Sequence, residues 1–386
     1  MEKEDFPNLE TRASLCPILM LPNELLTEIF NFYLPPYPTA PKIAGPGSPT
    51  YLLGVCRAWR TVVLNSPNLW RAMGIRPKGS ADLGRDAGVL RQWLVRSGTV
   101  PISLNLILRA NEDADPEQAA FVAAVLANRS RWEYFRWRLD WERVHLITGP
   151  APSIVDLNIG TSYQPPSHRQ ILRLDGATPH LRSVTLWNVG FGASSFEWKR
   201  LTTLALVNTD IEDCLTALGQ ATALIRCKLH MSTAGRQWAP LPGKTILPLL
   251  ETFIVDGGSS DALDTDIAQV ANPSQNWWGQ FVLPSLRRLA ASYNLLDPPG
   301  REALQLLASR SNCRLERLRV LTFAWIDLDF SDYREPVARM WSHVVTDLAD
   351  ADDVASADDE WRYEMYWEPR VDTVEEPHTS LSESHS

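Results

Sequence analysis

The feature that most constrains this chain is a six-residue pattern, apolar-x-x-apolar-x-apolar, that recurs through its middle. The pattern begins at eight positions, which are Trp132, Ile154, Leu181, Leu201, Leu224, Leu250, Leu286 and Leu315. Six of the seven intervals between successive starts are 20 to 29 residues long, and the seventh is 36. A unit of this length can form one short strand, but it cannot bury its apolar side chains alone, so neighbouring units must stack. The pattern therefore predicts a curved stack of strands with an open face for docking.

The spacing and the apolar positions resemble those of divergent leucine-rich repeats. The resemblance implies that residues 76–340 form an irregular solenoid that binds a target protein on its concave strand surface. In two of the units the asparagine, Asn188 or Asn208, comes one position earlier than in the usual repeat. An unrelated α/β domain is the alternative interpretation of the same pattern.

Two elements are expected before the first of these units, and one strand within it. A helix is predicted over 86–97, followed by a strand over 101–108 whose apolar residues alternate. Segment 131–143 mixes aromatic and basic residues, and a strand with one buried and one solvated face is the preferred interpretation. A nucleic-acid platform would also need a positive groove, which the charge of the body does not indicate.

Residues 18–75 contain three short segments that each begin with a proline at a plausible first helical position, at Pro22, Pro49 and Pro67. We expect helices over 21–34 and 50–65 and a third after Pro67. At about 100° per residue, the apolar side chains of 21–34 cover an arc of about 220°, roughly twice what one-sided burial needs. The surplus face must be covered by a partner or by the following domain of the same chain.

The motifs of this region resemble those of an F-box in kind and order. They are LPNELLTEIF from Leu21 to Phe30, VCRAWR from Val55 to Arg60, and NLW ending at Trp70. F-box domains are three-helix modules that bind the Skp-type adaptor of cullin-RING ubiquitin ligases, so the resemblance assigns the surplus face to that adaptor. The proline-rich insert at 35–47 is longer than the compact F-box link.

Matched residue by residue, the resemblance gives a set of candidates for contact with the adaptor. Some of them are expected to be internal core instead, Trp59 and Trp70 first among them, because large rings hold small modules together. The candidates are Leu21, Pro22, Leu25, Leu26, Ile29, Phe30, Val55, Cys56, Trp59, Leu69 and Trp70.

Charge is distributed unevenly along the chain. The formal net charge is −9, yet residues 347–386 hold 13 Asp and Glu against two Arg, which is −11, so the remainder is about +2. A near-neutral body offers no broad footprint for nucleic acid. Residues 341–386 are predicted to be a disordered acidic tail, with docking of its aromatic residues as the alternative, and residues 1–17 a second tail.

Other patterns predict no catalytic residues, no cofactor and no metal site. The five cysteines have no paired spacing, which favours a reduced compartment, cytoplasmic or nuclear, over a disulfide framework or a zinc site. No G-x-S-x-G, H-E-x-x-H or G-x-G-x-x-G occurs. No stretch approaches 18 consecutive apolar residues, so a membrane span is not expected.

The sequence as a whole predicts an α+β or α/β protein that is not an enzyme. The leading hypothesis is a substrate-recognition adaptor, in which the F-box-like module binds the Skp-type subunit and the repeat body binds an unknown protein. A free-standing leucine-rich-repeat recognition or scaffold protein is the second hypothesis, and an enzyme on a body that is not a repeat is the third. Within the insertion 257–281, Trp277 and Trp278 either anchor a substrate or pack down to fix the loop.

Overall fold

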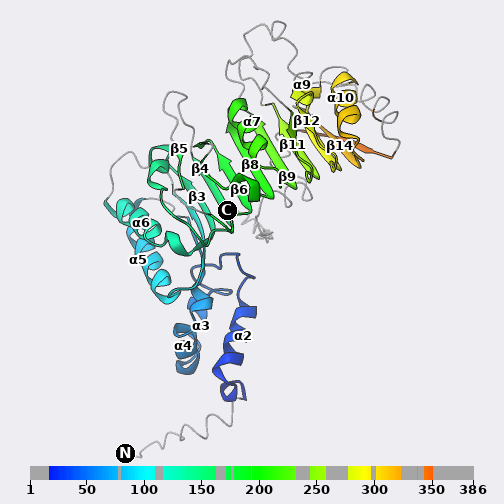
Figure 1. The fold of residues 1–386 in the computed structure, drawn as a ribbon. Helices are drawn as coiled ribbons and strands as arrows, with labels where there is room; N and C mark the ends of the chain where they lie inside the picture. Colours follow the sequence, from blue (N-terminus) through cyan, green and yellow to red (C-terminus); the bar gives the residue numbers. More distant parts are fainter. Residues whose placement is uncertain are drawn as a thin grey trace, which may run out of the picture.

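The protein has a mixed α/β structure with eight α-helices and one large parallel sheet among its described residues (Figure 1). The N-terminal helices lie beyond one end of the sheet. The computed structural model describes residues 17–76, 80–108, 116–161, 171–174, 178–192, 194–231, 244–257, 277–296, 301–322, 337 and 343–350.

The N-terminal region is helical, as its three proline signals predict. It contains the 3-10 helix η1 (Pro17–Met20), the helices α2 (Asn23–Tyr33), α3 (Pro49–Leu52) and α4 (Arg57–Leu64), and the 3-10 helix η2 (Pro67–Trp70). The expected single helix over 50–65 is wrong, because the chain is extended at Cys56. There the Cys56 thiol caps α4 by accepting a hydrogen bond from the Trp59 amide at 3.4 Å.

The large sheet has eleven parallel strands in sequence order. Residues 72–75, at the edge of the expected helical module, form its first strand, and 345–350, expected to be disordered, form its last. The strands are β1 (Ala72–Ile75), β2 (Ile102–Ile107), β3 (Trp132–Leu139), β4 (Asp156–Thr161), β6 (Ser183–Trp187), β8 (Thr203–Thr209), β9 (Arg226–Met231), β11 (Thr252–Asp256), β13 (Arg288–Ser292), β14 (Arg317–Thr322) and β15 (Val345–Asp350).

The strand register follows the six-residue pattern. Each of the eight units contributes one strand, and the fourth and sixth positions of neighbouring units lie in register. The fourth positions are Phe135, Leu157, Val184, Leu204, Cys227, Phe253, Leu289 and Leu318. All eight are at most 1% exposed. The sequence-based prediction of one strand per unit is confirmed, and the structure shows that the stacked strands run parallel.

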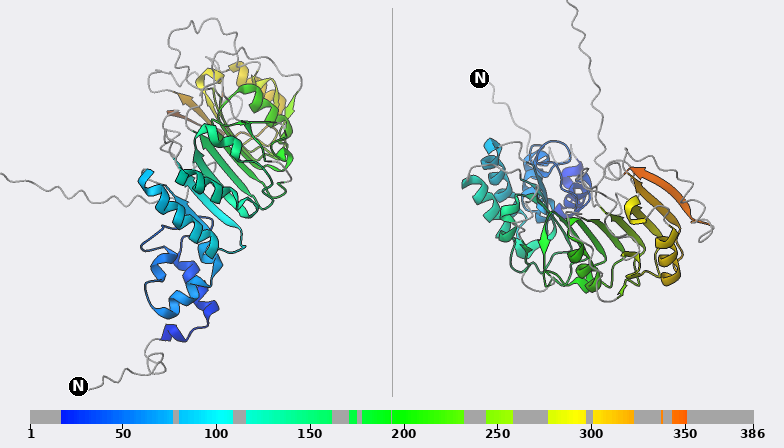
Figure 2. Two further views of the ribbon diagram at one scale, coloured as in Figure 1. Left: turned by 90° about the vertical axis from the view of Figure 1, so that its left-hand side faces the viewer. Right: turned by 90° about the horizontal axis from the view of Figure 1, so that it is seen from above.

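Helices and short strands cover the outer side of the curved sheet, as the view from above shows (Figure 2). The helix expected over 86–97 begins earlier, at Ser80. The covering elements are α5 (Ser80–Arg96), α6 (Pro116–Leu126), η3 (Arg129–Arg131), η4 (Trp141–Leu146), η6 (Trp198–Arg200), α7 (Ile211–Gln220), α9 (Tyr293–Leu296) and α10 (Arg301–Ser311), with the strand pairs β5 (Ile171–Leu172) and β7 (Gly190–Phe191), and β10 (Thr245–Ile246) and β12 (Phe281–Val282).

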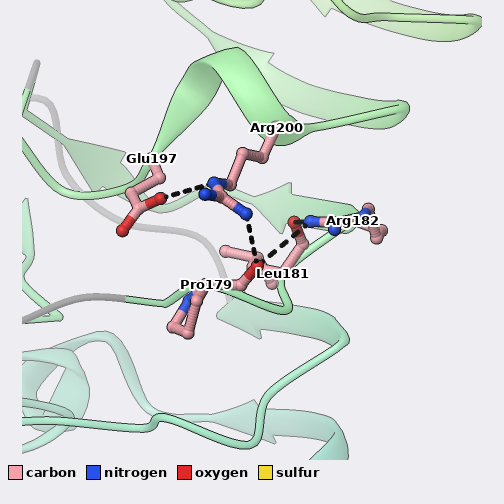
Figure 3. Close-up of polar contacts among 5 residues, drawn as sticks. All are labelled: Pro179, Leu181, Arg182, Glu197 and Arg200. Carbon is pink, nitrogen blue, oxygen red and sulfur yellow. Dashed lines mark hydrogen bonds and ion pairs between the residues drawn. The ribbon is translucent and has the colours of Figure 1, made fainter.

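Polar contacts join the turns that precede neighbouring strands (Figure 3). The carbonyl of Pro179, ahead of β6, accepts hydrogen bonds from the guanidinium groups of Arg182 and Arg200 at 3.3 and 3.2 Å. Arg200 also forms an ion pair with Glu197 at 2.9 Å. These contacts satisfy a turn carbonyl that the strand ladder leaves without a partner.

The proline-rich insert between α2 and α3 ties the N-terminal helices to the sheet. The Tyr37 hydroxyl donates to Glu133 Oε2 at 2.5 Å, and its ring lies edge-on to Tyr134 with centroids 5.5 Å apart. The Arg71 guanidinium lies 3.7 Å from the centre of the Tyr37 ring. Burial, and next the hydrogen bond to Glu133, raise the pKa of the Tyr37 hydroxyl. The insert therefore connects the N-terminal helices to the sheet through specific side-chain contacts.

Replacing Tyr37→Phe removes the hydrogen bond to Glu133, and we expect the free energy of unfolding to fall by about 1–2 kcal/mol at pH 7, the range for a bond to a charged group. Since the folded protein favours the neutral phenol, stability linked to Tyr37 is full below about pH 10 and is lost at higher pH. Urea unfolding of both proteins from pH 7 to 11 measures the two effects. Tyr51→Phe, at an exposed tyrosine, is the control and should change stability by under about 0.5 kcal/mol.

Candidate protein-binding face on the N-terminal helices

Helix α2 buries only one edge of its broad apolar arc. Leu26 and Phe30 are buried, whereas Leu25 is 51% exposed, Ile29 42% and Phe32 87%. These three exposed residues recur at the spacing i, i+4 and i+7, which places them on one side of the helix. The packing that the helix makes within the chain therefore uses the neighbouring side and leaves this one in solvent.

Further exposed apolar residues come from the elements beside α2. Tyr33 stacks on Tyr51 of α3, with ring centroids 6.4 Å apart and planes inclined by 21°, and both rings are partly exposed. Val55, in the turn before α4, is also exposed. We call the whole group the exposed apolar set; its members are Leu25, Ile29, Phe32, Tyr33, Tyr51 and Val55.

The core of the helical region is complete without this set. Phe30 contacts Trp59 with ring centroids 4.8 Å apart, and the Trp70 indole donates to the Val63 carbonyl at 2.8 Å. Trp70 also lies edge-on to Trp93 of α5 at 5.1 Å, which joins this core to that of the sheet. A contiguous interior thus runs from α2 into the core of the large sheet, and the exposed apolar set lies outside it.

The structure divides the sequence-predicted adaptor contacts into three groups. Leu25, Ile29, Val55 and Pro22 are exposed, and Leu21, Cys56 and Trp59 are half-buried. The other four, Leu26, Phe30, Leu69 and Trp70, are core residues and cannot contact a partner in this conformation. The prediction is corrected for Leu26, Phe30 and Leu69, because the helices pack through them, whereas Trp70 is internal core as expected.

Sequence reasoning left out three members of the set, which are Phe32, Tyr33 and Tyr51. They belong to the same apolar arcs as the candidates, but they lie outside the F-box-like motifs. The sequence spacing could have identified Phe32, because it follows Leu25 and Ile29 at the spacing of residues on one side of a helix. A groove of about 550 Å³ runs beside Phe32, between α2 and the proline-rich insert.

The two tryptophans of the insertion 257–281 are not exposed anchors. Trp277 and Trp278 are both fully buried, and the Trp278 indole donates to the Leu295 carbonyl at 2.9 Å. Their rings contact Phe281 and Phe253. The substrate-anchor prediction is thereby corrected, and the alternative, that they pack down, describes what is found. Residues 258–276 of the insertion lie outside the described residues.

The concave face of the sheet is a second surface of interest. Because alternate strand residues point to opposite faces, the positions between the buried apolar ones lie on this face. The row nearest the strand starts is polar, and its members are Asp156, Ser183, Thr203, Arg226, Thr252, Arg288 and Arg317. His230 and Asp256 lie side by side there, with Nδ1 and Oδ2 2.8 Å apart. Ser292 follows on the far side of Asp256, in strand β13. A Ser-His-Asp triad needs histidine in the middle, so this order does not form one.

Within the part of the chain that the structure describes, no cluster of three or more His, Cys, Asp or Glu could hold a metal ion. No described helix is both long and apolar enough to cross a membrane. No family model matches this chain, and no curated protein matches it.

Asp156 of the concave face offers a pH-dependent test of the sheet's electrostatics. Desolvation raises the pKa of its carboxyl, while the hydrogen bond from Ser183 and the charge of Arg136 act in the opposite direction. The ionised form is therefore less favoured in the folded protein, so its unfavourable effect on stability is present at neutral pH and absent below about pH 4.

We expect Asp156→Asn to raise the melting temperature at pH 7 by roughly 1–3 °C, the shift produced by up to about 1 kcal/mol in a chain of this size. The gain should shrink as the pH falls and be absent at pH 4. Calorimetry of the two proteins at pH 4, 5.5 and 7 measures it. A loss of stability at pH 7 would show that the carboxylate stabilises the fold.

Proposed function

We propose that this protein is a substrate-recognition adaptor of a cullin-RING ubiquitin ligase, with the N-terminal helices binding a Skp-type subunit. The observation that carries the proposal is the exposed apolar set, which remains in solvent after the helical region has completed its core. The resemblance of LPNELLTEIF, VCRAWR and NLW to F-box motifs supports the identity of the partner. The same segments that carry these motifs supply Leu25, Ile29 and Val55.

The size of the exposed apolar set fits a binding interface. Fully burying one large apolar side chain contributes roughly 1.5–3 kcal/mol. Three residues of α2 alone could therefore supply several kcal/mol on association, and aromatic residues such as Phe32 and Tyr33 are common interface anchors. Large exposed apolar patches on a folded protein generally mark contact sites.

The repeat body supplies the second surface that an adaptor requires. Its parallel strands form a curved sheet with a polar row on the concave face, and curved repeat proteins commonly bind other proteins on such a face. In our proposal the chain performs no chemistry. It raises the effective concentration of the target near the ligase, and proximity provides the rate increase.

A free-standing repeat protein is the second candidate function, and one observation favours it. The Trp70 to Trp93 contact attaches the N-terminal helices to α5, and the insert that holds Tyr37 against Glu133 attaches them to β3, as an end cap of a solenoid would be attached. A cap needs a polar outer surface. The exposed apolar set has the opposite character, which is why we place the adaptor role first.

The double substitution Leu25→Asp and Ile29→Asp should weaken binding to a Skp-type adaptor on the order of 100-fold, because two buried apolar contacts become unpaired charges. Calorimetric titration of the purified full chain with the adaptor measures the affinity. Phe30 is not a suitable site for this test, since it is buried in the core and its replacement would disturb folding.

The control is Val95→Asp, which places one of the two negative charges on an apolar residue of α5 that is 79% exposed. This variant should bind the adaptor like the unchanged protein. Unaltered affinity in the Leu25 and Ile29 variant, with its melting temperature preserved, would contradict the assignment of this face.

A further inference from the structure

Cations gather on the concave face in the C-terminal half of the sheet, between β9 and β14. Arg226 and Lys228 of β9, Arg288 of β13 and Arg317 of β14 lie at alternate strand positions, with Cys227, Leu289 and Leu318 on the opposite, buried face. All four cationic side chains are half-buried, so part of each reaches solvent. We call these four residues the basic strip; Arg319, also on this face, is buried.

The register places like charges beside each other within the strip. Arg226, Thr252, Arg288 and Arg317 occupy one row across four neighbouring strands, and Arg288 pairs directly with Arg317. Like charges in directly paired positions of a sheet disfavour folding. Earlier strands carry Ser183 and Thr203 in the same row, so the fold itself accepts neutral residues there.

The charge of the strip contrasts with that of its surroundings. Residues 1–346 carry about +2 in total, yet four cations lie within four adjacent strands, which span roughly 14 Å at about 4.8 Å per strand. The acidic group on the same face of these strands, Asp256, is hydrogen-bonded to His230. Across the turns before the strands, Arg287 is 3.4 Å from Glu316, and Glu251 precedes β11. The strip is thus a local concentration of positive charge.

We propose that the basic strip is the docking surface for a short acidic peptide segment of the target protein. The inference rests on the proposed function, of which it names the substrate class. An extended peptide advances about 3.3 Å per residue, so the strip's width matches about four consecutive residues. Each of the four cations also has a contact within the chain, so contacts with the acidic segment replace these internal contacts when the segment binds.

An acidic peptide fits this surface better than a nucleic acid does. The chain's net charge is −9, and residues 347–386 alone carry −11, which opposes a long polyanion. A short peptide needs only local complementarity, and four cations over roughly 14 Å supply it. The experiment must therefore distinguish binding of an acidic peptide from binding of a nucleic acid.

The test is fluorescence anisotropy of the full chain with a labelled hexaglutamate peptide at 50 and 500 mM salt. We expect binding at low salt and a loss of at least about ten-fold at high salt, because exposed charges are screened. The double variant Arg226→Thr and Arg288→Thr replaces each arginine with threonine, the residue found in the same row of the sheet at positions 203 and 252. It should bind roughly five-fold more weakly, as expected for two ion pairs that solvent reaches, without a lower melting temperature.

The matched control is Arg57→Thr with Lys199→Thr, which removes the same charge from two exposed positions outside the strip. Its peptide affinity should be unchanged. Equal weakening in both double variants would overturn the proposal, as would tighter binding of a single-stranded 20-nucleotide DNA than of hexaglutamate.

A gain in affinity after Asp→Asn replacement at 352, 353, 358 and 359 would show that the chain's own acidic region competes for the strip, which supports the strip's preference for acidic segments.

This experiment contains no Skp-type adaptor, so its result is separate from that of the adaptor titration. Hexaglutamate binding that is lost in the strip variant but kept in the Leu25 and Ile29 variant would support the strip even if the ligase role failed. If hexaglutamate does not bind, the proposed role of the basic strip is wrong, while the proposed adaptor interface is unaffected.

Discussion

Each strand of the large sheet carries apolar side chains that a single repeat unit cannot remove from water. In β8, for example, Leu204 is fully buried in a row with Val184 and Cys227 of the neighbouring strands, and Leu206 is fully buried in the next row with Leu186 and Leu229. This mutual burial fixes the parallel register. It also fixes which side chains face outward, since a shift of one residue would exchange the two faces of a strand.

Both surfaces that we assign to binding follow from this constraint. The register holds Arg226, Lys228, Arg288 and Arg317 on the concave face, opposite the buried fourth and sixth positions of each unit. The helical region joins the same interior through Trp70 and Trp93, and α2 contributes only Leu26 and Phe30 to it. The remaining apolar side of α2 has no place in the continuous core, so it stays on the outside.

The sequence predicted the strands far better than the surfaces. The six-residue pattern located eight strands, because period-two burial leaves a direct trace in apolar residues. It could not predict that Trp277 and Trp278 are buried, since the burial of Trp278 depends on Phe253 and the Leu295 carbonyl, which are distant in the chain. The strand β15 was missed for a similar reason: its acidic composition suggested a tail, while pairing with β14 decides its structure. On α2, periodicity gave the breadth of the apolar arc but not the side that packs inward.

The most direct test of the account is hydrogen exchange of the full chain, alone and with a saturating amount of a Skp-type adaptor. If the apolar side of α2 is a partner-binding face, backbone amides within 19–33 and 51–56 should exchange at least about ten-fold more slowly in the complex, while those of β6 and β8 should not change. Unchanged exchange in 19–33, or protection confined to the sheet, would contradict the claim.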